Sequence, residues 1–160
     1  MVDPKLIITR GRWLGLLAEL HRRGGNRHES GAFLLGSTDG PRRRVEEIVF
    51  YDDLDRHAYS TGICILEADS FETLWAQCRS TGLSVVADIH THGGAAQQSH
   101  SDRDNPMIAR AGHLALIAPG FARGPMWRHR LGVYSYNGAY QWTDFSGWKA
   151  RSIIKTGTWR

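Results

Sequence analysis

The chain has 160 residues, of which 41% are hydrophobic and 22% charged, and its formal net charge is +4. This composition is ordinary for a globular protein and excludes a disordered, collagen-like or coiled-coil chain. At roughly 150 residues per domain, the length favours a single domain over residues 1–160. The sequence has no apolar run of transmembrane length, and its first residues do not resemble a signal peptide, so we expect no membrane association.

Cysteine is rare and histidine is common, with Cys64 and Cys78 against eight histidines. Two cysteines cannot form a disulfide framework, so we expect buried apolar thiols in a cytoplasmic protein. A metal site would then use imidazole and carboxylate ligands. The net charge is small for a DNA-binding protein, and the basic run 42–44 is shorter than usual nucleic-acid motifs. A nucleic-acid partner is therefore not expected, and the charge fits an acidic protein equally well.

The first half of the chain predicts a helix followed by strands. Residues 13–20 have apolar side chains at helical spacing, and Gly24–Gly25 should end this helix. The apolar positions that we expect to face the core are Trp13, Leu14, Leu17 and Leu20. The apolar run 31–36 predicts a buried strand, residues 44–51 predict the strand that returns, and a third short strand is predicted near 60–66.

The second half continues this alternation. Residues 69–78 predict an amphipathic helix whose apolar positions are Phe71, Leu74, Trp75 and Cys78. Asn137–Gly138 predicts the type I′ turn of a hairpin. The other predicted elements are a central strand 83–89, a helix through 107–109, a buried strand 113–118 and the hairpin strands 131–136 and 139–142. The mixture indicates an α/β (α+β) fold.

The region near the C-terminus is rich in tryptophan. Trp142, Trp148 and Trp159 either pack in the core or form an exposed surface for a partner. The residues after Lys149 carry no pattern that assigns them to an element.

The chemistry of the chain centres on His90 and His92, an H-x-H motif at the end of the predicted central strand. Residues two apart on a strand face the same side, so both imidazoles can bind one metal ion. Asp102 lies ten residues after His92 and Asp104 twelve, and either carboxylate can complete a three-ligand site. Three protein ligands leave a position for water, as in catalytic zinc sites. Glu29, just before the strand 31–36, is the candidate general base.

Each of these residues also has a structural explanation when taken alone. Ser99 fits the N-cap of a short helix, and Asp102 fits its first turn. Glu29 fits a solvated charge at the end of a strand. The sequence also contains D-I-H-T-H at residues 88–92, which resembles the motif of polymerase-and-histidinol-phosphatase phosphoesterases. In that family the motif opens the chain and is followed by many more metal ligands, whereas here only 68 residues follow it.

Taken together, the motifs resemble the JAB1/MPN/Mov34 family. Residues 29–36, ESGAFLLG, look like the glutamate segment of that family, and residues 90–102, HTHGGAAQQSHSD, look like its JAMM signature. The resemblance covers most of the chain in the family's order of elements. It implies a mixed, curved β-sheet flanked by helices, with a cytidine-deaminase-like architecture.

The resemblance also implies site residues and an activity. His90, His92 and Asp102 become the ligands of one Zn²⁺ ion, with Asp104 as the alternative third ligand. Glu29 becomes the general acid/base, and Ser99 becomes the donor that stabilises the oxyanion. The implied enzyme is a deubiquitinase-like zinc isopeptidase or peptidase that cuts after the C-terminus of a ubiquitin-like protein.

The biological setting is implied in the same way. Bacterial members are often encoded with homologues of ubiquitin-activating or ubiquitin-conjugating enzymes, in some cases in antiviral defence. Those homologues and a ubiquitin-like protein or its conjugate are therefore the expected partners. The alternatives are a non-catalytic MPN scaffold and a RadC-like, DNA-linked protein. The sequence departs from the family pattern at Gly93, where proline is usual, and in the His92–Asp102 gap of ten where eleven is usual.

Overall fold

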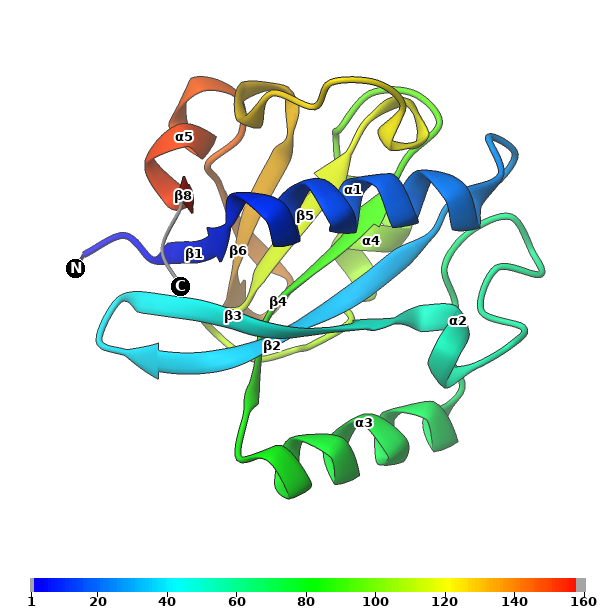
Figure 1. Ribbon diagram of the computed structural model, residues 1–160, viewed down its shortest axis with the longest axis horizontal. Coiled ribbons are helices and arrows are strands. Elements are labelled where there is room, and N and C mark those ends of the chain that lie inside the picture. Colours follow the sequence, from blue (N-terminus) through cyan, green and yellow to red (C-terminus); the bar gives the residue numbers. More distant parts are fainter. Residues whose placement is uncertain (1, 158–160) are drawn as a thin grey trace.

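The computed structural model describes residues 2–157 and contains one mixed, curled sheet of eight strands with helices against it (Figure 1). The strand order is β7-β6-β5-β4-β2-β3-β1-β8. The strands are β1 (Lys5–Thr9), β2 (Gly31–Asp39), β3 (Arg42–Phe50), β4 (Ser84–Thr91), β5 (Leu114–Ala118), β6 (Gly132–Gly138), β7 (Gln141–Asp144) and β8 (Ile154–Gly157). The predicted α/β (α+β) class with a mixed, curved sheet is confirmed.

Five α-helices and three 3₁₀-helices connect or cover the strands of the described chain. The α-helices are α1 (Arg10–Gly24), α2 (Tyr51–Leu54), α3 (Ala68–Thr81), α4 (His100–Asp104) and α5 (Ala150–Ile153). The 3₁₀-helices are η1 (Gly120–Ala122), η2 (Arg128–Arg130) and η3 (Gly147–Lys149). Within residues 2–157, no helix is both long and apolar enough to cross a membrane.

The central strand β2 is buried on both faces, which explains its continuous apolar run. Ala32 and Leu34 belong to the core that α1 covers, whereas Phe33 and Leu35 belong to a second core beneath α3. In Figure 1, α1 crosses one face of the sheet and α3 lies apart from it, below β2 and β3. The two helices therefore close two separate apolar layers.

Strand β4 positions the candidate site. It pairs antiparallel with β2 and parallel with β5, so it lies in the middle of the sheet. Gly31 is paired with His90, which brings the residues just before β2 to the end of β4 where the histidines lie. Residues far apart in sequence thus meet where β4 ends and β2 begins.

Two predicted elements are wrong. Residues 60–66 form turns and an extended loop, because Gly62 has a φ of +90° and the backbone bonds to Glu29 and Ala58 instead of to a strand. The helix predicted through 107–109 is irregular chain, since α4 ends at Asp104, just before Asn105–Pro106. Strand β1 was not predicted; its short apolar run pairs in parallel with β3 and β8.

The remaining corrections concern positions within predicted elements. The hairpin of β6 and β7 is confirmed, but the two central turn residues with positive φ are Ala139 and Tyr140 rather than Asn137–Gly138. On α1, Leu14 is exposed and Leu16 takes its place in the core. On α3, the indole of Trp75 is 39% exposed. Both cysteines are only partly buried, Trp148 is exposed, and Trp159 lies outside the described residues.

Candidate metal centre

The two histidines of the H-x-H motif lie at the end of β4 with their rings turned toward each other. His90 is the last strand residue but one, and His92 follows the strand directly. Their Nε2 atoms are 3.0 Å apart, and the Nδ1 atom of His92 is 3.2 Å from the carbonyl oxygen of Ala95. That contact orients the His92 ring so that Nε2 faces His90. The shared side of the strand thus brings two nitrogen donors to one point.

Asp102 reaches both imidazoles from the first turn of α4. Its Oδ1 is 3.3 Å from Nε2 of His90, and its Oδ2 is 3.1 Å from Nε2 of His92. A capping box fixes this carboxylate, because the Ser99 N–H donates to Oδ2 while the Asp102 N–H donates to Oγ of Ser99. Asp104 is exposed and does not line the cleft around the histidines. The geometry favours Asp102 over Asp104 as the third ligand.

Glu29 approaches the histidines from the other side, just before β2. Its Oε1 lies 3.8 Å from Nε2 of His92, and its Oε2 accepts a hydrogen bond of 3.4 Å from the Cys64 N–H. The Glu29 N–H in turn donates to the carbonyl oxygen of Gly62. The loop that replaces the predicted strand 60–66 therefore holds the glutamate in place.

The two carboxylates differ in their acidity. Burial raises the pKa of Glu29, and the nearby imidazoles only partly offset this. Burial also acts to raise the pKa of Asp102, but its hydrogen bonds to His90 and His92 outweigh burial and the pKa lies well below its usual range. For His92, burial favours the neutral ring, yet the hydrogen bond and charge of Asp102 raise its pKa. One carboxylate is therefore poised to take up a proton, and the other stays ionised.

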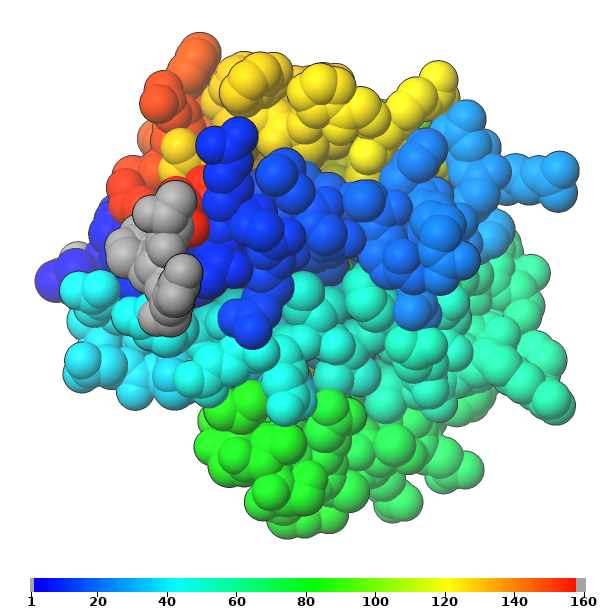
Figure 2. Space-filling view, in the orientation of Figure 1, coloured from blue at the N-terminus to red at the C-terminus, as the bar shows by residue number. Residues whose placement is uncertain are grey.

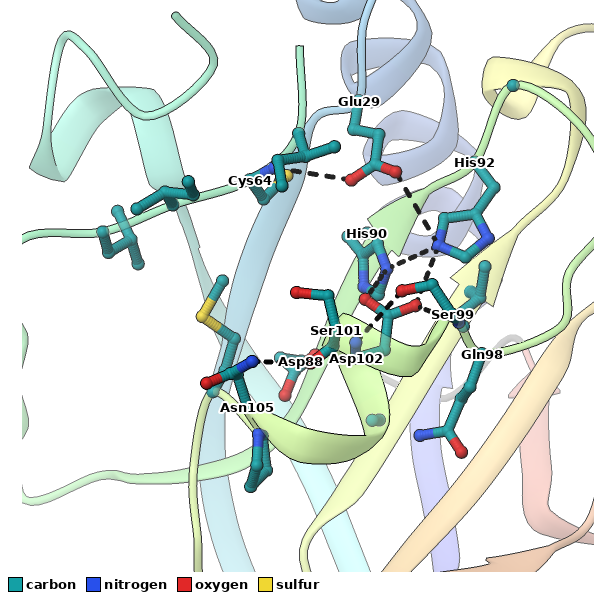
Figure 3. A pocket seen from close by; sticks show the side chains of 18 of the residues that line it. Glu29, Cys64, Asp88, His90, His92, Gln98, Ser99, Ser101, Asp102 and Asn105 are labelled. Carbon is teal, nitrogen blue, oxygen red and sulfur yellow. Dashed lines mark hydrogen bonds and ion pairs between the residues drawn. The ribbon is translucent and has the colours of Figure 1, made fainter. Parts of the chain in front are cut away.

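These side chains line a cleft of about 940 Å³ (Figure 3). Figure 3 shows Glu29 above the histidines and Asp102 below them, with Ser99 beside Asp102. The apolar part of the wall includes Ile63, Ile65, Leu66, Phe71 and Met107. The cleft therefore combines an apolar wall with the polar group of Glu29, His90, His92 and Asp102.

Gly93, the departure from the usual proline, has a specific packing reason. A Cβ atom at this position would lie 2.7 Å from the ring of Phe121. The Phe121 N–H donates to the carbonyl oxygen of His92, and Phe121 has a φ of +53°. Glycine thus allows an aromatic ring to pack directly against the backbone that follows the second histidine.

Some residues of the cleft were not predicted from the sequence as residues of the site. Asp88 lines the cleft and lies two residues before His90, on the same face of β4, and its Oδ2 is 2.6 Å from Nε2 of the buried His113. The D-x-H-x-H alternation carries the signal for Asp88. Cys64 and Trp142 also line the cleft, and only the tertiary fold places them there.

The donor set fits a divalent metal ion. Ligand atoms of Glu29, His90 and His92 all lie within 4.8 Å of one another, and Asp102 contacts both imidazoles. The two Nε2 atoms are 3.0 Å apart, and the carboxylate of Asp102 lies within 3.3 Å of each, so a cation at this point would meet several ligand atoms at once. Imidazole and carboxylate ligands of this kind bind several divalent transition metals, zinc among them.

Comparisons with known proteins bear on the family of this chain. A family model described as prokaryotic homologs of the JAB domain matches residues 15–131. A protein of Sinorhizobium fredii named "Probable metalloprotease y4jG" is 28% identical over 129 residues, which cover 79% of this chain and 78% of that protein.

Two solved structures resemble the fold. The solution structure of protein DSY2949 from Desulfitobacterium hafniense has a TM-score of 0.65 at 18% identity and covers 94% of this chain and 92% of that one. The solution structure of a protein from Salinibacter ruber has a TM-score of 0.55 at 19% identity, with 92% and 90% covered. At these identities the likeness supports the fold alone.

Proposed function

The chain belongs to the family of prokaryotic homologs of the JAB domain, and we propose that it is a zinc-dependent peptidase acting on a ubiquitin-like protein. The family and the relative named a probable metalloprotease support a metal-dependent, peptidase-like role. The observation that carries the proposal is the convergence of Glu29 on the two imidazoles that Asp102 already contacts. The bond to be cut is the peptide or isopeptide bond after the C-terminus of the ubiquitin-like protein.

His90, His92 and Asp102 would hold the zinc ion. When bound, zinc makes water more acidic and polarises a carbonyl group as a Lewis acid. Glu29 is placed to accept the proton of the attacking water, because burial raises the pKa of its carboxyl group and one oxygen faces the histidines. The protonated Glu29 then donates to the leaving amine.

Ser99 is placed to donate to the oxyanion of the tetrahedral intermediate. Its Oγ accepts the Asp102 N–H as a helix cap, and this leaves the hydroxyl proton free for a second partner. Ser99 is exposed and lines the cleft. The structural role of Ser99 and the proposed catalytic role are therefore compatible in one side chain.

The proposed class of substrate is argued from the cleft. An extended C-terminal tail has the form that fits between the apolar wall and the polar group. We extend the proposal to a cytoplasmic ubiquitin-like pathway with homologues of activating or conjugating enzymes, in a setting such as antiviral defence. The two free thiols are consistent with a reducing compartment.

Metal analysis and one glutamate variant test the proposal. We expect one zinc ion per purified chain, and its loss on replacing His90 and His92 with alanine. Glu29→Gln should keep the zinc and slow cleavage of a ubiquitin-like protein with a C-terminal extension by about 10²–10⁴-fold. Glu72→Gln, an exposed glutamate on α3, is the matched control and should cleave normally.

Two results would contradict the proposal. Cleavage by Glu29→Gln at the parent rate would remove Glu29 from the mechanism. A protein that binds its partner equally well without metal, and cleaves nothing, would be a scaffold.

A further inference from the structure

The net positive charge of the chain comes from its last quarter. Residues 119–157 contain six Lys or Arg and one acidic residue, Asp144, whereas residues 1–118 contain 13 Lys or Arg and 15 Asp or Glu. The modest net charge therefore combines a slightly acidic body with a strongly basic segment. Such asymmetry indicates an anionic partner for the basic part.

Tertiary packing gathers this charge around two exposed indoles. Trp127 and Trp148 are 64% and 69% exposed. Helix η2 packs against η3, and the ring of His129 stacks on Trp148 with centroids 4.3 Å apart and an angle of 13°. The guanidinium of Arg151 lies 5.6 Å from the Trp148 ring. We call the group the Trp–Arg surface; it comprises Trp127, His129, Arg130, Trp148, Lys149 and Arg151.

The segment that carries the Trp–Arg surface is tied to the rim of the cleft on both sides of η2. The chain leading to it starts at the rim, where the Gly120 N–H donates to the carbonyl oxygen of Gly94 and the Phe121 N–H donates to that of His92. It returns to the rim beyond η2, where the Tyr134 hydroxyl donates to the carbonyl oxygen of Ala96. Figure 2 shows the yellow and orange segments that carry the surface side by side at the upper left. The surface and the rim of the cleft are thus joined through directly bonded segments, and we infer that a protein bound in the cleft can also contact the surface.

We propose that the Trp–Arg surface is a second binding site for an acidic patch on the protein whose chain occupies the cleft. Exposed tryptophan and arginine are the residues that most often dominate protein–protein binding energy. Arginine pairs with carboxylates through two parallel hydrogen bonds, and Arg130 and Arg151 are exposed. That the acidic protein is also the substrate rests on the proposed function.

A protein partner fits better than a single-stranded nucleic acid. Bases bind such surfaces by stacking on free aromatic faces. The ring of Trp148 already stacks on His129 and has Arg151 beside it, so its own neighbours compete for those faces. The edge of the indole and the guanidinium groups remain available, and these suit carboxylates and apolar side chains.

Fluorescence anisotropy with two probes tests this. One probe is a fluorescein-labelled peptide of Asp, Glu and Leu residues, and the other is labelled oligo(dT). We expect the acidic peptide to bind the full chain and the double variant Arg130→Glu/Arg151→Glu to bind it about tenfold or more weakly. The matched control is Arg42→Glu/Arg44→Glu, the same charge change at exposed positions of the β2–β3 hairpin, which should change binding little.

The outcomes separate the alternatives. Tighter binding of oligo(dT), lost in the same double variant, would overturn the proposal in favour of a nucleic-acid site. Equal weakening by both double variants would mean non-specific attraction and would also overturn it. Binding is measured with a chelator present, so the result does not depend on peptidase activity. Failure of the proposed function is therefore distinguishable from failure of this proposal.

Discussion

Two groups of histidine and carboxylate meet at the C-terminal part of β4, yet they differ in burial and in how their polar atoms are paired. Asp88 and His113 form a closed pair whose side chains are 3% and 1% exposed and are joined by one contact of 2.6 Å. His90, His92, Asp102 and Glu29 form a second, open group, and their side chains line a cleft. The first group satisfies itself, whereas the second turns two imidazole nitrogens toward each other.

A histidine–carboxylate contact alone therefore does not mark a metal site. A buried pair needs one donor for one acceptor, and Asp88 with His113 meets that need. The second group has two imidazoles and two carboxylates around one point, an arrangement whose charges balance best around a cation. We therefore expect changes to the closed pair to alter stability and changes to the open group to alter metal binding.

The largest expected effect is on metal affinity. Asp102→Asn should weaken zinc binding by more than about 100-fold, because loss of even an outer partner of a ligand costs 10–100-fold. Asp104→Asn, two residues away and exposed, should leave zinc affinity unchanged. Competition with a fluorescent chelator measures both. The reverse ranking would assign the third ligand to Asp104.

The closed pair should govern stability instead. Asp88→Ala leaves a buried imidazole without its carboxylate and should lower the free energy of unfolding by about 3–5 kcal/mol. Asp104→Ala, at an exposed position, should change it by less than about 0.5 kcal/mol. Urea denaturation of the metal-free protein measures both. If Asp88→Ala lost all of its zinc but kept its stability, Asp88 would belong to the metal-binding group, and the contrast between the two groups would be wrong.

A smaller effect on the free energy of unfolding is expected at Gly93, which follows His92 and lines the cleft. Gly93→Ala places a methyl group 2.7 Å from the Phe121 ring, so the ring must move away from the backbone after His92. We expect a loss of about 1–3 kcal/mol, the usual cost of overpacking. Gly94→Ala is the matched control, because a Cβ there meets no atom within 4 Å. Equal stability of both variants would mean that the Phe121 contact is not tight in solution.

The sequence predicted the parts of the site that local pattern determines. The alternation along β4 placed both histidines on one face, and the S-x-x-D spacing corresponds to the capping box of Ser99 and Asp102. The buried strand β2 followed from its apolar run. These features depend on neighbours within a few residues.

The parts that the sequence missed depend on distant partners. The apolar residues near 60–66 have the pattern of a strand. In the structure, however, the backbone N–H of Cys64 donates to the Glu29 carboxylate, and the segment forms a wall of the cleft. Asp88 and His113 are 25 residues apart, so nothing local predicts their pairing. The basic segment was visible as composition, but only η2 packing on η3 shows that its indoles and guanidinium groups share a surface.

The smallest expected effect is a shift with pH in the stability of the metal-free protein. It concerns Glu29, a carboxylate of the open group. Burial raises the pKa of Glu29 above its ordinary value of 4.5, so the folded state favours the neutral carboxyl. Such a group contributes stability below the unfolded pKa and loses it as pH rises through the folded pKa. Glu29→Gln should therefore raise the melting temperature of metal-free protein at neutral pH, and the gain should vanish below pH 4.5.

Asp102 should behave in the opposite way, because its pKa is lowered in the folded state. Its contribution is present above the unfolded pKa and is lost as pH falls, so Asp102→Asn should lower the melting temperature at neutral pH. Thermal melts of both variants in chelator, at several pH values, measure the two slopes. A Glu29→Gln variant that melts lower than the parent at neutral pH would mean that Glu29 supports the fold, as Asp88 does. A glutamate whose removal stabilises the fold and abolishes cleavage would be retained for chemistry alone.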